Sequence, residues 1–386
     1  MKTLPDAPNL DHLRQQAKDV LPQLRVVRPG ATLSDAQALI AEYGFRAWSD
    51  LVAAVNRRTT TIRRDDDAAR IVAETFGLGA PTGPLTSLER QWAGQAWSLS
   101  TDRGRWLVRQ LFDLAGAANE WEVLLAEAAA AAGIVTHRPV RSSRSQIVET
   151  LNGARWRVYE RPPLGPEPPT PASSRHATAA GRIIGRVHRL GLPAPMPPAR
   201  WITAVRSEQQ WWTLHAAAEA AEAPWARRLA EVIPTIVDVS GVVEPAEAAG
   251  DIILSPCHWA PNAFREARGD ELAVVIWEHT GAIPLRWDVG SAVLEWSRGV
   301  HGSVNASAAC ALMSGYVAEA SVPPDLDVAA FTAAVCANSN WLATRIQISI
   351  KEQDPERRAV AARAVPGLLA DLLTRPYLEL VLHAVR

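Results

Sequence analysis

The sequence predicts an α+β protein: a small mixed sheet with one helix, then a mainly helical region, with a short helical module in front. Three patterns lead to this prediction. Two pairs of alternating apolar and polar runs, each joined by turn residues, indicate β-hairpins before residue 160. The stretch 162–171 is rich in proline, and most of the chain after Asp288 has helical periodicity.

The first 57 residues have the pattern of two or three short helices. After Asp11, which suits a helix N-cap, one face of the first helix carries Leu13, Ala17, Val20, Leu21 and Leu24. Such short helices bury too little apolar area to be stable alone. We therefore expect 1–57 to be a packing module, or one that docks a protein partner, and the polar residues 58–67 to be a linker.

Two hairpins and one helix make up the predicted sheet region, 68–160. The first hairpin pairs 95–100 with 105–111 across the turn 101–104, and a helix over 120–132 follows. The second pairs 146–150 with 155–160 around Asn152-Gly153, a dipeptide typical of two-residue hairpin turns.

The remaining 161–386 are predicted to be mainly helical. The proline-rich stretch 162–171 cannot be regular structure and is expected to link two lobes or to form a lid. We expect helices over 177–190 and 207–232, and short buried strands over 252–254 and 272–276.

Composition excludes several classes of protein. With 40 basic and 41 acidic residues the net charge is −1, which gives no reason to expect nucleic-acid binding. The three cysteines, Cys257, Cys310 and Cys336, have no CxxC spacing, so neither a disulfide framework nor a structural zinc site is expected. The start of the chain lacks the apolar core of a signal peptide, and no run of about 20 apolar residues suits a membrane span. A cytoplasmic protein is therefore expected.

Six short stretches, in order along the chain, carry a resemblance to a known family. They resemble the motifs W-x-V-K, LGxLHRLG, H-x-D-x-x-x-x-N, IDWEHAG, W-[DE]-L-[AG] and NWL, and they are Trp106–Arg109, Gly181–Gly191, Cys257–Asn262, Val275–Gly281, Arg286–Gly290 and Asn340–Leu342. Over about 68–380 the chain resembles bacterial aminoglycoside phosphotransferases and choline-kinase-like proteins. The abundance of Ala and Arg beside few Lys fits a GC-rich bacterial genome.

This resemblance implies a two-lobed, protein-kinase-like fold that uses ATP and Mg²⁺. Arg109 stands at the position of the lysine that pairs with the phosphates, and Glu127 lies in the helix whose glutamate holds that lysine. By the same resemblance, Tyr159 and Glu160 at the end of the last strand contact nucleotide, and Asn262 binds metal.

The chain departs from the family pattern at three positions. Arg109 replaces the lysine; it keeps the charge but not the geometry of an ammonium group. Counting back from Asn262, the base aspartate is replaced by Cys257, or by His258 if one residue is missing. Ile276 replaces the metal-binding aspartate and offers no oxygen ligand. His258 as a base and Glu278 as a metal ligand are the residues that would have to compensate.

Each candidate also has a purely structural interpretation. His258 would be a loop or core histidine, Cys257 a small buried apolar residue, Asn262 a brace for its loop, and Asp288 the cap of the next helix. Arg109 and Glu127 would form a structural ion pair.

Three functions follow from these alternatives. The first is a pseudokinase that binds a small molecule, a peptide or a protein partner, with Cys257 and Ile276 weighing against ATP and Mg²⁺ as cofactors. The second is an atypical ATP-dependent phosphotransferase acting on a hydroxylated metabolite or modified peptide. The third is a kinase fold reused for other chemistry in natural-product biosynthesis, with Cys257, His258, Glu278 and His279 as candidate catalytic groups.

Overall fold

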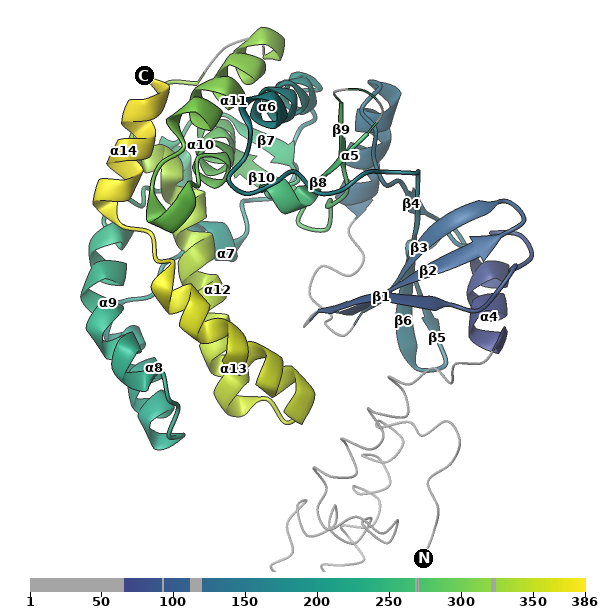
Figure 1. Cartoon of the computed structure of the whole chain (residues 1–386), viewed down its shortest axis with the longest axis horizontal. Helices are drawn as coiled ribbons and strands as arrows, with labels where there is room; N and C mark the ends of the chain where they lie inside the picture. The colour runs from purple at the N-terminus through teal and green to yellow at the C-terminus, as the bar shows by residue number, and fades with distance from the viewer. Residues whose placement is uncertain (1–65, 92–93, 112–119, 268, 270, 321–323) are drawn as a thin grey trace, which may run out of the picture. The chain divides into compact units, whose positions relative to one another are not determined.

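The computed structural model describes most of the chain after the predicted N-terminal module (Figure 1). The described residues are 66–91, 94–111, 120–267, 269, 271–320 and 324–386, so the predicted module and nearly all of the predicted linker lie outside them. By their contacts these residues form two compact units. The first unit holds 66–111, 140–159 and 353–355, and the second holds 120–139, 160–352 and 356–386.

The first unit is a six-stranded sheet with one helix, α4 (Asp66–Phe76). The strands run in the order β1-β2-β3-β6-β4, and β5 pairs with β6. Their bounds are Thr86–Gln91 (β1), Gly94–Thr101 (β2), Gly104–Leu111 (β3), Pro139–Val140 (β4), Val148–Leu151 (β5) and Ala154–Glu160 (β6). Buried Val72 and Phe76 of α4 pack with Leu99, Val108 and Trp156 of the sheet, which fixes the helix on one face.

Both predicted hairpins are confirmed. β2 and β3 pair antiparallel up to Thr101 opposite Gly104, and β5 and β6 pair up to Leu151 opposite Ala154. Asn152 and Gly153 have φ values of 51° and 76°, the positive values that a type I′ turn requires. The sequence analysis did not predict β1 or β4.

The second unit is mainly helical and contains two small antiparallel ribbons, β7 with β10 and β8 with β9. Its strands are Ile252–Ser255 (β7), Phe264–Glu266 (β8), Leu272–Val274 (β9) and Gly281–Pro284 (β10). Its α-helices are Glu120–Ala131 (α5), Ser174–Arg189 (α6), Arg200–Thr203 (α7), Glu208–Ala220 (α8), Ala226–Ser240 (α9), Leu285–Trp296 (α10), Ala306–Glu319 (α11), Thr332–Lys351 (α12), Pro355–Ala370 (α13) and Arg375–Val385 (α14). None of the described helices combines the length and apolar character needed to cross a membrane.

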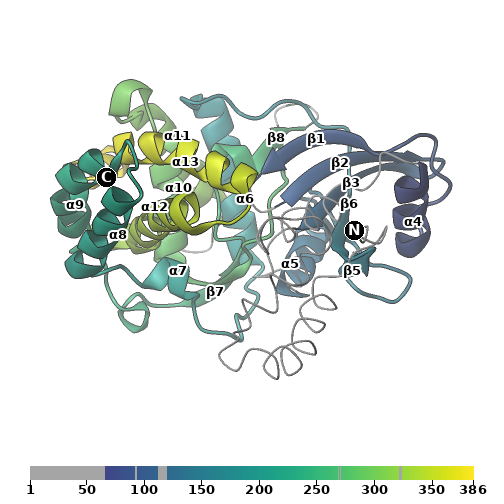
Figure 2. The same ribbon diagram turned by 90° about the horizontal axis from the view of Figure 1, so that it is seen from below.

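Two sequence predictions need correction here. The single helix expected over 207–232 is in fact two helices, α8 and α9, which lie side by side (Figure 2). The chain turns between them because Glu222 takes a φ of 52° and Pro224 follows, and neither continues a helix. The strand expected over 272–276 ends at Val274, so Ile276 lies in a loop.

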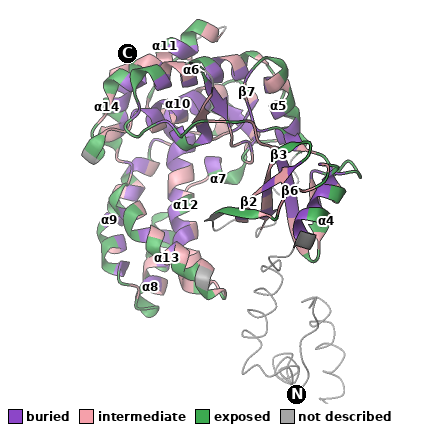
Figure 3. Ribbon diagram, turned by 45° about the vertical axis from the view of Figure 1, so that its right-hand side comes forward, coloured by how far each residue is buried: buried purple, intermediate pink, exposed green. Residues whose placement is uncertain are grey.

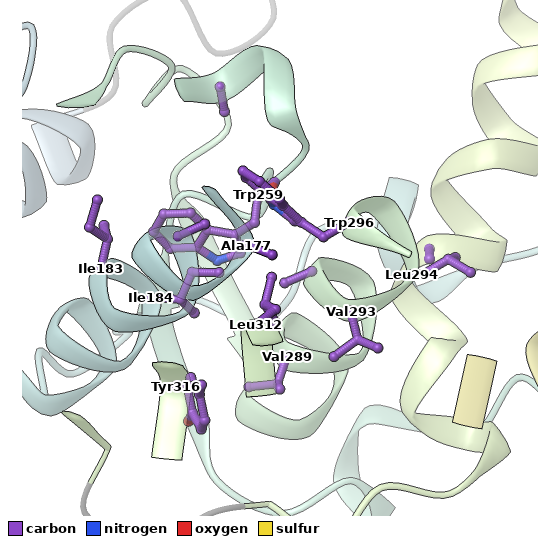
Figure 4. Close-up of a cluster of buried hydrophobic side chains, with 14 of the residues drawn as sticks. Ala177, Ile183, Ile184, Trp259, Val289, Val293, Leu294, Trp296, Leu312 and Tyr316 are labelled. Atoms are coloured by element: carbon purple, nitrogen blue, oxygen red, sulfur yellow. The ribbon is translucent and has the colours of Figure 1, made fainter. Parts of the chain in front are cut away.

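The core of the second unit surrounds α6, α10 and α11. Figure 4 shows side chains of these helices, among them Ile184, Val293 and Leu312, gathered with Trp259 and Trp296. In Figure 3 buried residues line the inner faces of these helices, while α8 and α9 carry exposed residues along their outer sides.

Helices α6 and α11 approach each other closely because glycines lie at their contact. A Cβ atom added at Gly181 would lie 2.0 Å from the Leu312 carbonyl oxygen, and one added at Gly315 would lie 2.2 Å from that of Thr178. Real Cβ atoms cannot approach backbone this closely, so both helices would have to separate.

We predict that Gly181→Ala lowers the free energy of unfolding by about 1–3 kcal/mol or more, because overpacking displaces a helix. Gly367→Ala is the matched control: Gly367 lies within α13 and a Cβ there meets nothing within 4 Å. The control should gain up to about 1 kcal/mol from helix propensity. Urea unfolding of the two variants measures both effects; equal stabilities would contradict the close-packing argument.

Candidate functional site

Two loops of the second unit meet at one end of the β7–β10 ribbon. Ser255, the last residue of β7, pairs with Gly281, the first residue of β10. The loop 256–263 therefore leaves the ribbon where the segment 275–280 enters it. These are the two segments that the sequence analysis singled out for the base and metal positions.

A buried carboxylate, that of Asp288, holds the first loop in place. Its Oδ2 accepts hydrogen bonds from the Ser255 hydroxyl, from Trp259 Nε1 at 2.7 Å and from His188 Nε2 at 2.8 Å. On its other side the His188 ring accepts a hydrogen bond at Nδ1 from the Tyr316 hydroxyl, 3.1 Å away. Asp288 thus joins α6, the end of β7, the loop and α10.

The expectation that Asp288 caps the following helix is wrong. Helix α10 begins at Leu285, and its N-cap, Pro284, makes no side-chain cap. Asp288 lies within the first turn and faces inward, where it is buried.

Cys257 lies two residues beyond β7 with a φ of 54°, a backbone conformation that favours glycine, asparagine and aspartate. Its thiol lies 3.4 Å from the Ser255 carbonyl oxygen and 3.6 Å from that of Gly281. The side chain also packs against the buried cluster that contains Ile202 and Trp287. Burial, together with the charge of Asp288, raises the pKa of this thiol well above its usual value. Cys257 is therefore held as a neutral thiol.

His258, rather than Cys257, contacts Asn262. The ring N–H at Nε2 donates to the Asn262 Oδ1, 2.9 Å away. The His258 ring also lies edge-on to His279, with ring centroids 5.7 Å apart, and His279 lies 5.9 Å from the Trp201 ring. Of the two residues considered for the base position, only His258 joins this group of polar side chains.

Ile276, at the position of the metal-binding aspartate, contacts apolar side chains. It is half-buried and packs against the main hydrophobic cluster of the second unit. Next to it Trp277 is fully buried and donates from Nε1 to the Thr136 hydroxyl. Glu278 is half-buried, two residues after Ile276. Among the described residues, no group of three or more His, Cys, Asp and Glu side chains is placed to hold a metal ion.

The remaining candidates lie on other elements and are described within their own units. Arg109 lies on β3, opposite Ala96 of β2, and is half-buried. Tyr159 on β6 is buried, with the Arg157 guanidinium 5.2 Å from its ring centroid. In the second unit, Glu160 is held by Arg138, whose Nε and Nη2 donate to its two oxygens at 2.8 and 2.9 Å.

Helix α5 carries a buried glutamate that the sequence analysis did not single out. Glu127 is exposed on α5, whereas Glu122 on the same helix is fully buried. The spacing along the helix indicates that Glu122 lies on its buried face, because Glu122 precedes the buried Ala126 and Ala129 by four and seven residues.

Comparison with known proteins finds similarity in structure alone. No family model matches the chain, and no curated protein matches it by sequence. The fold is similar to that of spectinomycin phosphotransferase, solved with ADP and spectinomycin, at a TM-score of 0.57 and 9% identity over 82% of this chain and 97% of that one. It is also similar to amicoumacin kinase, solved with AMP-PNP and Ca²⁺, at a TM-score of 0.50 and 13% identity over 79% of this chain and 94% of that one. Choline kinase LicA from Streptococcus pneumoniae matches at a TM-score of 0.50 and 13% identity, over 80% of this chain and all (100%) of that one. At such identities the likeness shows the fold alone.

We predict that Asp288→Ala strongly destabilises the protein. Three buried donors, on Ser255, Trp259 and His188, would lose their acceptor, at a cost of about 1–3 kcal/mol each. Asp238→Ala, which removes an exposed carboxylate from α9, is the control and should be near neutral. Thermal unfolding of both variants checks this, and a similar melting temperature for the two would show that the network stabilises little.

A second prediction concerns the thiols. Cys310 is exposed, whereas burial raises the pKa of Cys336 to about 12 and that of Cys257 well above its usual range. Because the thiolate is the reactive form, iodoacetamide at mildly alkaline pH should modify Cys310 first, as read by peptide mass spectrometry. Cys257 and Cys336 should react at a comparable rate only after unfolding. The pKa of each of these two thiols is higher in the folded protein than in the unfolded chain. Their contribution to the free energy of unfolding is therefore complete below the pKa of the unfolded chain and is lost as pH rises above it. Rapid modification of Cys257 in the folded protein would contradict its assignment as a neutral thiol.

Proposed function

We propose that this chain, which has the protein-kinase-like fold of aminoglycoside phosphotransferases and choline kinases, is a pseudokinase. It binds a small molecule, a peptide or a protein partner and does not transfer phosphoryl groups efficiently.

The observation that carries this proposal is the state of the two substituted positions. Phosphoryl transfer depends on a positioned base and on metal ions that neutralise the phosphate charge. Here Cys257 is a neutral thiol directed at backbone carbonyls, and the half-buried Ile276 packs against the hydrophobic core. Losing one group of this kind typically costs several powers of ten in rate, or about 4–8 kcal/mol of barrier.

The residues present do not fit the metal site of a kinase. Mg²⁺ demands hard oxygen ligands, and Ile276 provides none. The candidate metal ligands that carry a side-chain oxygen are Asn262 in the first loop and Glu278 in the second. We therefore derive no step through Mg²⁺.

The hydrogen bonds and strand pairing around Cys257 and Ile276 support the proposal that catalytic groups are missing while the local fold is kept. Asp288 still fixes the loop through Ser255 and Trp259, and β7 and β10 still pair. The substitutions thus change side chains in two loops whose surroundings keep their hydrogen bonds and strand pairing.

One observation favours the atypical phosphotransferase as a second candidate. His258 places Nε2 on the Asn262 amide oxygen, which leaves Nδ1 as the ring nitrogen that would accept a proton from a substrate. A neutral imidazole at this place is a chemically reasonable base. The neutral Cys257 thiol, in contrast, gives no support to the third candidate, reuse of the fold for other chemistry.

We predict no Mg²⁺-dependent phosphotransfer from ATP to spectinomycin, choline or a mixture of hydroxylated metabolites, measured by ADP release. Calorimetric titration with ATP should show no effect of Mg²⁺ on affinity. Turnover that Asn262→Ala or His258→Ala abolishes would overturn the pseudokinase proposal and favour the second candidate.

The double variant Cys257→Asp/Ile276→Asp tests the same argument in the opposite direction. By returning both carboxylates, it should gain Mg²⁺-dependent ATP binding that the unmodified chain lacks. Ile252→Asp, which adds a carboxylate at an exposed position of β7, is the matched control and should gain nothing.

A further inference from the structure

Helix α7 presents a large aromatic side chain beside the His258 loop. Ile202 of α7 is buried in a cluster with Ile283, Trp287 and Ala333, and this contact anchors the helix. The preceding residue, Trp201, is 38% exposed. Exposed tryptophan on an anchored element is costly to leave in water and is enriched where ligands bind.

An aromatic row connects Trp201 with the catalytic-loop position. The Trp201 ring lies 5.9 Å from His279, and His279 lies 5.7 Å from His258, which in turn donates to Asn262. These separations are those of interacting aromatic pairs. The row thus offers flat rings and imidazole nitrogens along one surface of the second unit.

The side-chain amide of Asn340 on α12 links the Arg206 guanidinium to the backbone of Trp201 by hydrogen bonds. Its Nδ2 donates to the carbonyl oxygens of Trp201 at 3.0 Å and Ala204 at 2.7 Å, and its Oδ1 accepts from the Arg206 guanidinium. One amide therefore fixes the backbone under Trp201 and the head of Arg206 together.

Arg206 carries a charge that no carboxylate of the described residues balances. Several other half-buried arginines of this unit pair with acids, as Arg286 does with Glu244 and Arg298 with Glu295, whereas Arg186 bonds to a backbone carbonyl oxygen. Arg206 bonds to the neutral Asn340 amide instead, and burial lowers the pKa of its guanidinium. A guanidinium has five N–H donors, and an unpaired, partly desolvated one is a recognition site for carboxylate or phosphate.

The acids near this surface do not reverse its charge. Glu278, next to His279 in the chain, is half-buried and has interactions of its own. Glu208 on α8 accepts a hydrogen bond from Trp212 Nε1 at 3.2 Å. The described residues also contain no three-ligand group suited to a metal ion, which disfavours a metal site at the two histidines.

We propose that Trp201, His279 and Arg206 form a subsite for a ligand that joins a flat aromatic group to an anion, either a carboxylate or a phosphate. The aromatic part lies against Trp201 and His279, and Arg206 binds the anion. This deepens the proposed function, on which it rests, by naming the class of ligand that the chain binds.

Calorimetric titration of the full chain with four naphthalene probes tests the proposal. Naphthoate and naphthyl phosphate should bind, and their relative affinities tell which anion is preferred. Neutral naphthamide and cationic naphthylmethylammonium should bind at least about tenfold more weakly, because they lose the charge-assisted hydrogen bonds. Arg206→Gln should remove this preference for anions, and Trp201→Ala should weaken all binding by about fivefold.

Matched variants separate this subsite from general effects. Trp212→Ala removes a tryptophan with the same 38% exposure, and Arg227→Gln removes an exposed arginine; neither should change the affinity for naphthoate. Equal affinity for the acid and the amide, no binding of either anion at millimolar concentration, or equal effects of Trp201→Ala and Trp212→Ala would overturn the proposal. Turnover with ATP is measured separately, so the pseudokinase proposal and the choice of ligand class can fail independently.

Discussion

The second unit depends on a single carboxylate oxygen. Oδ2 of Asp288 accepts three hydrogen bonds, from His188 on α6, from Ser255 at the end of β7 and from Trp259 in the loop that follows. Charge-assisted hydrogen bonds of this kind are among the strongest in proteins, and the low-dielectric surroundings strengthen them further. The fourth segment joined is α10, which carries Asp288 itself. Segments that lie up to 100 residues apart in the chain are thereby held in one arrangement.

This arrangement explains how the loop that carries Cys257 and His258 is held in place. Trp259 packs with Phe264 and Trp296 in the hydrophobic core while its Nε1 reaches Asp288, so the loop is fixed from inside. The side chains on the outer side of the loop, His258 and Asn262, are held by each other. The path of the loop and the chemistry of its outer surface are thus determined by different residues.

Patterns among residues close together in the sequence were enough to predict much of the fold. Features that depend on contacts between distant residues could not be predicted. The Asn152-Gly153 turn was predictable because its positive φ values are encoded by two adjacent residues. The polar strand β1 was not, since it forms only by pairing with β2. The family resemblance singled out Cys257 and Ile276, but Ile276 was expected in a strand and lies in a loop. Asp288 was assigned to a helix cap because its partner His188 lies 100 residues away in the chain. Arg206 gave no signal at all, since an unpaired charge is visible only in three dimensions.

The backbone at Cys257 has a consequence for how this loop can evolve. A φ of 54° is unfavourable for cysteine, by about 1 kcal/mol, and is tolerated better by asparagine, aspartate or glycine. The cysteine therefore does not set the conformation that it occupies; Ser255, Trp259 and Asp288 impose it. Mutational drift at this position can exchange one functional group for another while the loop keeps its path. A loop held in this way keeps its backbone geometry independently of the functional group at this position, so that the side chain can change while the path of the chain does not.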